Sequence, residues 1–276
     1  MAHSSELVGV LPKLAPDYGG TYSAPQSLIP DTYTPGGIWE TFSTYTQGDD
    51  QMIFVNEFTG PPGILTLSYA GRTGIAVMSV TAKGLPTPSS VTLVPTDPDT
   101  EWGSAIVGSG GYMYVYGADL DRAHHNAVSS MKVARVPVGQ SLDVTAWRYW
   151  NGSQWVAGEP NAALVPTVNQ LTGVMPDPDG EGFIAVSTPS GLFHDITVDL
   201  SYASSPAGPW TVPQSVYVIP EIKQYGDEMA YFPTFHPELS SRDQLIVSYN
   251  IDTTVGYPVL LRDIHSYQPR FIMISG

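Results

Sequence analysis

The sequence contains no cysteine and few basic residues, and each shortage excludes classes of protein. Without cysteine, the 276 residues can form neither a disulfide framework nor a thiolate metal site. Lys and Arg together number 11 against 26 Asp and Glu, which gives a formal net charge of −15 at pH 7. This charge argues against nucleic acid as a partner, because phosphates require a basic face, and against electrostatic docking on anionic lipid.

Long apolar runs are also missing from the chain. No window approaches the roughly 18 apolar residues of a membrane span, so we expect no span. The stretches of Ala, Leu, Glu and Lys that build helical bundles are absent as well. Residues 1–30 contain no basic segment followed by an apolar run, so the sequence predicts no signal peptide there.

Turn-forming and aromatic residues are abundant instead. The chain has 27 Gly, 25 Pro and 16 Tyr, and its hydrophobic content of 42 % is too high for a disordered tail. This composition predicts one acidic, turn-rich all-β domain over residues 1–276. The lack of Cys, together with few Lys and many Thr, Ser, Gly and Pro, leads us to expect an extracellular, cell-wall or virion-associated protein.

A pattern of strand, short polar turn and strand occurs four times along the chain. Its copies begin at residues 38, 101, 168 and 231, which are 63, 67 and 63 residues apart. Each copy continues into a third strand (72–80, 129–137, 195–203, 267–275), and the first three into a fourth (89–95, 147–155, 215–220). A unit of four antiparallel strands at a constant period predicts a β-propeller blade. A Greek-key sandwich also holds many short strands, but it does not explain the period.

We therefore predict a single all-β domain, a β-propeller of four-stranded antiparallel blades. The four visible blades span approximately residues 36–96, 97–160, 161–221 and 222–276. The fourth repeat ends after three strands, so its outer strand must come from elsewhere. Residues 1–35 are too short for a further complete blade, but residues 7–14 are a candidate for the strand that closes the ring.

Propeller topology separates the loops onto two faces. If the inner strand of each blade runs away from one face, that near face carries the long loops, which include acidic residues such as Asp195 and Asp252. Binding residues concentrate on loops held by a rigid scaffold, although long loops are also where polar residues collect. The starts of the four inner strands should ring the central funnel at this face with Glu40, Glu101, Gln170 and Tyr231.

Two of these funnel residues, Glu40 and Glu101, have a tryptophan beside them, Trp39 and Trp102. This combination suits a sugar, because acids can work on the glycosidic bond while aromatic rings stack on the sugar faces. Hydrolysis requires a proton donor of raised pKa and a second carboxylate that activates water or attacks directly. The structural alternatives are carboxylates bonded to the backbone and tryptophans packed between blades.

His236 belongs to the last predicted inner strand and is followed by Pro237 and Glu238. Its side chain would point toward the propeller axis or into the core of its blade. In the core it is a satisfied histidine, and at the axis it is a ligand, either to a cation through water or to the substrate. The sequence predicts no dedicated metal site, and the cofactor we expect is a structural calcium ion near the axis.

Seven short motifs occur in an order that resembles a known family. They are YVYG (114–117), ARVP (134–137), WRYWNGSQW (147–155), SSPAGPW (204–210), FHPELS (235–240), VSYN (247–250) and YQPRF (267–271). The chain resembles the actinobacterial domain of unknown function 4185, associated with glycoside hydrolase family 183, the endo-D-arabinofuranases. The resemblance implies a five-bladed propeller that cleaves the arabinan of cell-wall arabinogalactan, with relatives in phages of such hosts. It also implies a funnel role for His236, with Tyr231 nearby.

The chain departs from that family in two places. Family members have an additional first blade that carries an acidic residue at the funnel, and only four blades are visible here. Gln170 stands where an acidic residue is expected, and an amide cannot donate a proton as a carboxylic acid does. A partner chain or a second copy would then supply the missing blade.

Two main functions follow from these observations. As an arabinan hydrolase, the chain would use Glu40 and Glu101 as acid and base, and would contact the polysaccharide through Trp39, Trp102, Gln170, Tyr231, His236 and Asp195. As a non-catalytic carbohydrate-recognition module, for example in a phage tail or at a cell surface, it would bind the same polysaccharide without cleaving it. A third function is that of a structural hub in an assembly.

Overall fold

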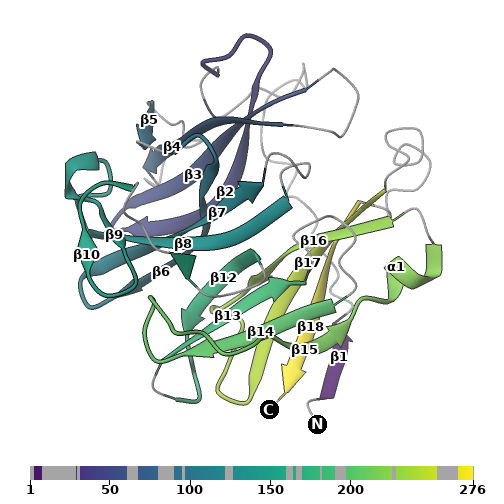
Figure 1. The fold of residues 1–276 in the computed structure, drawn as a ribbon. Coiled ribbons are helices and arrows are strands. Elements are labelled where there is room, and N and C mark those ends of the chain that lie inside the picture. The colour runs from purple at the N-terminus through teal and green to yellow at the C-terminus, as the bar shows by residue number, and fades with distance from the viewer. Residues whose placement is uncertain are drawn as a thin grey trace.

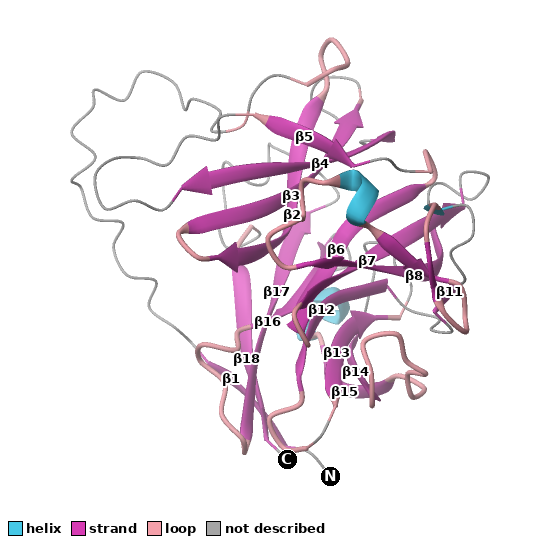
Figure 2. Ribbon diagram, turned by 90° about the vertical axis from the view of Figure 1, so that its left-hand side faces the viewer, coloured by secondary structure: helices cyan, strands magenta, loops and turns pink. Residues whose placement is uncertain are grey.

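Strands are the dominant element of the described part of the chain, and helix is scarce (Figure 1, Figure 2). The computed structural model describes residues 3–7, 29, 32–60, 68–79, 90–94, 97–121, 127–159, 164–165, 170–180, 182–189, 197–225, 228–253 and 267–275. These residues form four antiparallel sheets arranged as a four-bladed β-propeller, which confirms the predicted fold class. The fifth blade implied by the family resemblance is not among the described residues.

Blades 1 and 2 come from the first half of the chain. Blade 1 runs from its inner strand β2 (Ile38–Gln47) through β3 (Asp50–Thr59) and β4 (Ser68–Ser79) to β5 (Val91–Val94). Blade 2 runs from β6 (Thr100–Ser109) through β7 (Tyr112–Asp121) and β8 (Ala127–Pro137) to β9 (Arg148–Trp150) and β10 (Trp155–Val156). Strand β11 (Leu164–Val165) pairs with β8, and the 3-10 helix η2 (Val144–Ala146) precedes β9.

Blades 3 and 4 complete the described ring. Blade 3 contains β12 (Gln170–Pro176), β13 (Phe183–Thr188), β14 (Thr197–Ala203) and β15 (Gln214–Val218). Blade 4 contains β16 (Glu228–Phe235), β17 (Gln244–Thr253) and β18 (Pro269–Ser275). Helix α1 (Pro220–Tyr225) links the two blades at the outer edge of the molecule (Figure 1). No helix in these described segments is long and apolar enough to cross a membrane.

The outer strand of blade 4 comes from the other end of the chain. Strand β1 (His3–Leu7) pairs antiparallel with β18, so the two termini lie side by side at the bottom of Figure 1. The sequence pointed to residues 7–14 for this strand; the strand observed is His3–Leu7, and residues 8–14 lie outside the described residues. A chain whose first strand covers the edge of its last sheet leaves that edge paired.

Short hairpin turns join the first two strands of blades 1 and 2, as the repeat predicted. The connections are longer in blade 3, from Pro176 to Phe183, and in blade 4, from Phe235 to Gln244. Between β6 and β7 the loop is Gly110–Gly111, with φ angles of 56° and 80°. Positive φ at both central residues is the geometry that matches the twist of the flanking strands, and glycine adopts it without a Cβ clash. The glycines of this turn therefore fix the register of the whole blade 2 hairpin.

Each inner strand is bulged at a corresponding place. The register of pairing with the second strand shifts between Thr41 and Thr44 in β2 and between Trp102 and Ala105 in β6. The same occurs between Leu171 and Gly173 in β12 and between Tyr231 and Thr234 in β16. A bulge bends its strand and re-aims the neighbouring side chains, so these four bulges set the shape of the central channel.

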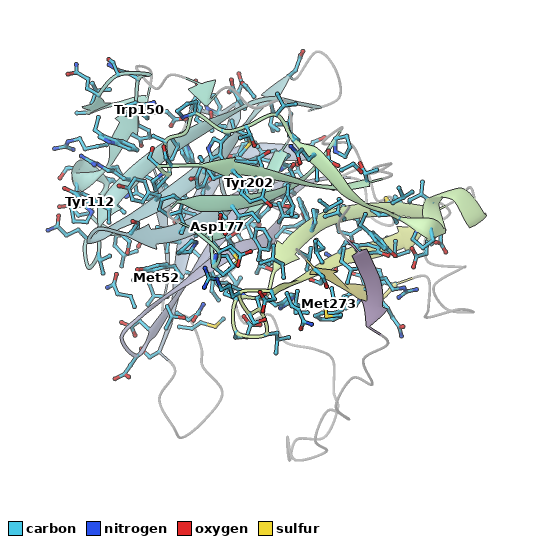
Figure 3. All side chains as sticks on the ribbon, turned by 90° about the horizontal axis from the view of Figure 1, so that it is seen from below. Met52, Tyr112, Trp150, Asp177, Tyr202 and Met273 are labelled. Atoms are coloured by element: carbon cyan, nitrogen blue, oxygen red, sulfur yellow. The ribbon has the colours of Figure 1, made fainter. Side chains whose placement is uncertain are left out.

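The core consists of layers between adjacent blades, and side chains fill these layers when the molecule is seen from below (Figure 3). One apolar cluster joins blades 1 and 2, a second joins mainly blades 2 and 3, and a third joins blades 3 and 4. Sheets buried on both faces read as continuous apolar runs, as β3 does at its buried centre. Figure 3 labels Met52 on blade 1, Tyr112 and Trp150 on blade 2, Asp177 and Tyr202 on blade 3, and Met273 on blade 4.

Blades 4 and 1 meet through an aromatic contact of their inner strands. The rings of Phe42 in β2 and Phe232 in β16 lie 5.6 Å apart, edge to face. None of the apolar clusters formed by the described residues combines side chains of these two blades.

Candidate functional site

The near end of the channel, where the inner strands begin, brings three predicted residues to equivalent places. Glu40, Glu101 and Gln170 each stand directly before the residue at which the register of their strand shifts. In β16 this place belongs to Ala230, and Tyr231 follows it. The sequence-based alignment treated Tyr231 as the fourth member of this set; the observed register places Ala230 there, one residue earlier, and β16 begins at Glu228 rather than at residue 231.

Glu40 is the carboxylate whose surroundings most resemble those of a proton donor. It is partly buried in β2, and this burial raises the pKa of its carboxyl above the ordinary value. Loss of water disfavours the charged form of an acid, so a carboxyl in this environment keeps its proton to a higher pH. A raised pKa is the property expected of a general acid in the hydrolysis of a glycosidic bond.

Tyr231 lies on the opposite side of the seam and responds to two carboxylates. Its pKa is held well above the ordinary value, first by burial and then by its neighbours Tyr267, Asp252 and Glu40. The charges of Asp252 of blade 4 and Glu40 of blade 1 both act on this phenol, and the strand register places Tyr231 opposite Asn250, two residues before Asp252 in β17. A phenol with a raised pKa stays neutral and can donate and accept hydrogen bonds.

Asp252 is a site residue that the sequence singled out only as one of several near-face acids. It lies near the end of β17, is 4 % exposed, and accepts a hydrogen bond of 2.6 Å from the backbone N–H of Thr253. Burial raises the pKa of its carboxyl, although the hydrogen bond from Thr253 opposes the shift. Its place at the near end of the second strand was the signal that would have grouped it with Glu40.

Glu101 is less accessible than Glu40. Its side chain belongs to β6 and the residue is 7 % exposed. Strands β2 and β6 are neighbouring inner strands, so the two glutamates occupy corresponding positions on adjacent blades. Gln170 continues the series in β12 and is likewise buried.

Trp102 packs in the core between blades 1 and 2. The residue is 0 % exposed, and its ring meets Trp147 and Tyr149 edge to face at centroid distances of 6.3 and 5.6 Å. Its Nε1 donates a hydrogen bond of 3.0 Å to Glu159. No face of this ring is open to a sugar. Trp102 is therefore a tryptophan packed between blades, the structural alternative to a sugar platform.

Trp39 is only partly buried. Its ring meets Tyr33 edge to face at 6.2 Å, and it packs against the cluster of Ile53, Val55 and Ala76 in blade 1. Across the β2–β3 pair it faces Glu57, which holds Arg72 at 2.7 Å and accepts a hydrogen bond of 2.6 Å from the N–H of Thr34. These contacts tie the segment before β2 to the blade and so position the start of the strand that carries Glu40.

A cavity of about 530 Å³ extends from the bulges toward the far end of the channel. Its walls come from all four inner strands and from Asn250 of β17; they include Thr41–Thr44, Ser104, Ile106, Thr172–Val174, Phe232 and Thr234–Glu238. His236 lies at this far end, immediately after β16, which ends at Phe235. The sequence placed His236 within an inner strand beside Tyr231; because β16 ends earlier, the two residues stand at different levels of the channel.

His236 makes two side-chain hydrogen bonds. Its Nε2 lies 2.8 Å from Oγ of Ser248, and its Nδ1 lies 3.1 Å from Oε1 of Glu238. The ring also packs on Phe271 at a centroid distance of 5.0 Å. Both ring nitrogens are therefore engaged by neighbouring side chains of blade 4.

The calcium ion expected near the axis stays a prediction. Within the segments that the structure describes, no three His, Asp or Glu side chains lie close enough to hold a metal ion. The two ring nitrogens of His236 are bonded to side chains, so this histidine does not offer an open ligand position. Asp195, predicted to contact the substrate, lies outside the described residues.

The family assignment follows from the sequence as a whole. The family described as domain of unknown function DUF5005 matches residues 21–276. The chain belongs to the DUF5005 family. The motifs had suggested domain of unknown function 4185 and glycoside hydrolase family 183, and that narrower assignment is not confirmed.

Solved structures resemble the DUF5005 chain in fold. A putative hydrolase from Bacteroides ovatus matches with a TM-score of 0.61 and 16 % identity over 86 % of this chain and 61 % of that one. An exo-β-1,3-galactanase from Phanerochaete chrysosporium, solved with galactose, matches with a TM-score of 0.51 and 13 % identity over 86 % of this chain and 46 % of that one. No curated protein matches the sequence.

These structural likenesses show that the DUF5005 chain has a propeller fold shared with glycoside hydrolases. At 13 and 16 % identity they carry the fold alone. The DUF5005 chain also spans less than two thirds of the length of either protein. The function must therefore be argued from the residues of the channel.

Proposed function

We propose that this propeller hydrolyses glycosidic bonds of a polysaccharide at the near end of its channel, with Glu40 as the proton donor. The observation that carries the proposal is the burial of Glu40 at the start of β2, which raises the pKa of its carboxyl. A glycosidase needs a carboxylic acid that still holds its proton when the leaving oxygen departs. Among the carboxyls at the near end, Glu40 meets this need and is also only partly buried.

The second carboxylate of the proposed mechanism is Glu101. It stands on the neighbouring inner strand at the place that corresponds to Glu40, directly before the bulge. Asp252 is the competing choice, but burial raises the pKa of its carboxyl. A base or nucleophile must be ionised at the working pH, so a raised pKa suits this role poorly. Asp252 and Tyr231 then serve to bind the sugar hydroxyls beside Glu40.

The substrate class we propose is a cell-wall arabinan. The seven motifs resemble a family of endo-D-arabinofuranases, and the near end of the channel carries Glu40, Glu101 and Gln170 at equivalent places of three inner strands. A neutral polysaccharide is also compatible with a chain of net charge −15. Such a polymer lies outside the cell, so an extracellular, wall-associated or virion-associated location belongs to the same proposal.

A carbohydrate-recognition module is the second candidate, and Gln170 favours it. This residue gives the third inner strand an amide where the first two strands have Glu40 and Glu101. An amide can donate and accept hydrogen bonds to a sugar but cannot transfer a proton. A channel with two acids and one amide binds a polysaccharide through the same surface whether or not it is cleaved.

The test is a search for released oligosaccharides. Purified chain is incubated with cell-wall arabinogalactan, β-1,3-galactan and β-1,4-xylan across a range of pH, and the products are separated by chromatography and weighed by mass spectrometry. The proposal predicts that arabinogalactan releases oligoarabinosides, and that Glu40→Gln lowers the rate of this release about 100-fold or more. Asp243→Asn is the matched control, because Asp243 is exposed in the far-face turn before β17.

Each result separates the candidates. Products from arabinogalactan that persist at the full rate with Glu40→Gln would remove Glu40 from the mechanism. Products from galactan alone would replace arabinan as the substrate. Binding to arabinogalactan without any product, retained by Glu40→Gln, would establish the recognition module. The structural calcium ion and a partner chain that adds a further blade remain predictions, to be tested by metal analysis and by the mass of the protein in solution.

A further inference from the structure

The far end of the channel holds a group of polar side chains that glycosidic hydrolysis at Glu40 does not use. Ser248, His236 and Glu238 form a continuous hydrogen-bonded chain, with 2.8 Å between Ser248 Oγ and His236 Nε2 and 3.1 Å between His236 Nδ1 and Glu238 Oε1. A hydroxyl, an imidazole and a carboxylate linked in this order are the parts of a nucleophilic site. We propose that these residues, with Asn250, form a second catalytic site that hydrolyses small O-acyl esters.

The direction of the two hydrogen bonds follows from the chemistry of the acceptor. A carboxylate accepts hydrogen bonds and donates none, so Nδ1 of His236 carries the proton that is shared with Glu238. In a neutral imidazole the other nitrogen then has a free lone pair. Ser248 therefore donates its hydroxyl proton to Nε2, which is the direction that a general base requires.

The backbone fixes the imidazole in this place. The N–H of His236 donates to the carbonyl of Ile246 at 2.9 Å, and the carbonyl of His236 accepts a hydrogen bond of 2.8 Å from Ser240 Oγ. Ser240 Oγ in turn accepts a hydrogen bond of 2.9 Å from the N–H of Ile246. The ring packs on Phe271, which is the neighbour of Ser248 in the adjacent strand β18. Pre-positioned groups of this kind lose little freedom when a substrate binds.

The residues around the proposed nucleophile line the cavity, whereas Ser248 itself is not one of the wall residues. His236, Glu238, Thr234 and Asn250 line the cavity, and Ser248 lies in β17 directly opposite Thr234. Ser248 and Asn250 are two residues apart on one strand, so their side chains share a face. The amide N–H₂ of Asn250 is thereby placed to receive the oxygen of a carbonyl group attacked by Ser248, as side-chain amides do in oxyanion holes.

Glu238 is a positioning residue in this site. Its side chain is 65 % exposed, so solvent screens its charge and its main effect is to hold the tautomer and the orientation of His236. The lining of the cavity is otherwise made of Thr, Ser and apolar side chains together with Asn250. A neutral, small acyl group such as acetyl fits such walls. The alcohol of the ester would be a sugar hydroxyl, and this choice of alcohol rests on the proposed function.

The reaction balances without a cofactor. Ser248 Oγ forms a bond to the carbonyl carbon while its proton passes to His236 Nε2, and the alcohol leaves with that proton when the ester C–O bond breaks. Water then attacks the acyl-serine, giving its proton to His236, and the acid is released as Ser248 recovers a proton. Ester and water become alcohol and acid, and no electron transfer takes place.

The test is covalent labelling of the unmutated chain with an ethyl fluorophosphonate, followed by peptide mapping. Serine attack displaces fluoride and leaves one phosphonyl group on the oxygen, so the proposal predicts time-dependent modification at Ser248. The exposed Ser79, whose hydroxyl donates to Asp50 at 2.8 Å without an imidazole, is the internal control and stays unmodified. Labelling that spares Ser248, or that modifies Ser79 equally, would overturn the proposal whatever the variants do.

Hydrolysis of p-nitrophenyl acetate provides the second readout. Ser248→Ala is expected to abolish the protein-dependent rate, and His236→Asn to lower it about 100-fold or more. Glu238→Ala should lower kcat with little change in KM, and Glu238→Gln should restore most of the rate, because a Gln oxygen still accepts from Nδ1; a merely structural role would not produce this rescue. An unchanged rate with Ser248→Ala would overturn the proposal. Because no polysaccharide is present, the result is independent of glycosidic cleavage at Glu40.

Discussion

Tyr231 in the inner strand of blade 4 and Glu40 in the inner strand of blade 1 interact across the seam between these blades. The charge of Glu40 contributes, after burial and the neighbours Tyr267 and Asp252, to holding the pKa of Tyr231 well above its ordinary value. Carboxyls of two neighbouring blades, Asp252 and Glu40, therefore both act on this phenol. The seam is also the junction without a shared apolar cluster among the described residues, and the rings of Phe42 and Phe232 meet there edge to face.

The pH dependence of polysaccharide cleavage follows from Glu40. Burial raises the pKa of this acid, so the protonated form needed for catalysis survives above the pH at which an ordinary glutamate ionises. We expect the rate to be sustained through mildly acidic pH and to fall as the pH rises through the raised pKa of Glu40. The measurement is kcat/KM against pH on arabinogalactan. A rate that increases steadily toward alkaline pH would contradict this assignment.

The two tryptophans beside the glutamates should differ in their effect on stability. Trp102 is fully buried against Trp147 and Tyr149, so Trp102→Ala is expected to lower the free energy of unfolding by about 3–5 kcal/mol. Trp39 is only partly buried, and Trp39→Ala should cost clearly less. Denaturant unfolding of both variants makes the comparison. Equal losses of the free energy of unfolding in the two variants would contradict the packing role of Trp102. So would a Trp102→Ala variant that loses glycan binding without being destabilised.

Glu57 should make stability depend on acid. Burial opposes its ionisation, but hydrogen bonds from Thr34 and Arg72 and the charge of Arg72 outweigh it and lower the pKa of Glu57. A carboxyl whose pKa is lower in the folded state stabilises the fold above its unfolded pKa, about 4.3, and loses this contribution as the pH falls through the folded value. The Tm difference between the native chain and Glu57→Gln should therefore shrink as the pH falls from 6 toward about 3. A difference that stays constant over this range would show that the pairing with Arg72 is not the cause.

Removal of β1 should expose the edge of blade 4. A chain lacking residues 1–7 loses the strand that pairs with β18, and an unpaired edge strand invites pairing with another molecule. We expect a lower Tm and association that increases with protein concentration, measured by thermal unfolding and by light scattering. A chain lacking only residues 1–2 keeps His3–Leu7 and is the matched control. Identical behaviour of the two truncated chains would contradict the role of β1 as a closing strand.

The fold was predictable because its signal is local and repeated. Each blade shows a hairpin with turn residues such as Gly110–Gly111 between strands of β-branched and aromatic residues, and four copies at one period define a propeller. The position of β1 was harder, because its pairing with β18 joins the two ends of the chain and only long-range contact decides which residues form the strand. The bulges in the inner strands are equally invisible in the pattern of residue types.

The site was predictable in part for the same reason. Glu40 and Glu101 stand out because two inner strands start alike, yet sequence could not distinguish the partly buried Glu40 from the more deeply buried Glu101. Tyr231 stands one place later than these residues relative to the bulge of its own strand. Ser248 carries no signal of a site in the sequence, because a serine within a strand is common. Its contact with His236 depends on the register of the β16–β17 hairpin, which brings the two residues together across a turn.

The most direct test of the central claim, that Glu40 is the proton donor, compares two substrates that differ in the leaving group. In a polysaccharide the leaving group is a sugar alkoxide, which departs poorly unless it receives a proton. In a dinitrophenyl glycoside of the same sugar unit the leaving group is dinitrophenolate, which departs readily without one. We expect Glu40→Gln to lower the rate of polysaccharide cleavage about 100-fold or more and to retain cleavage of the dinitrophenyl glycoside. Equal loss on both substrates, or loss on neither, would contradict this expectation.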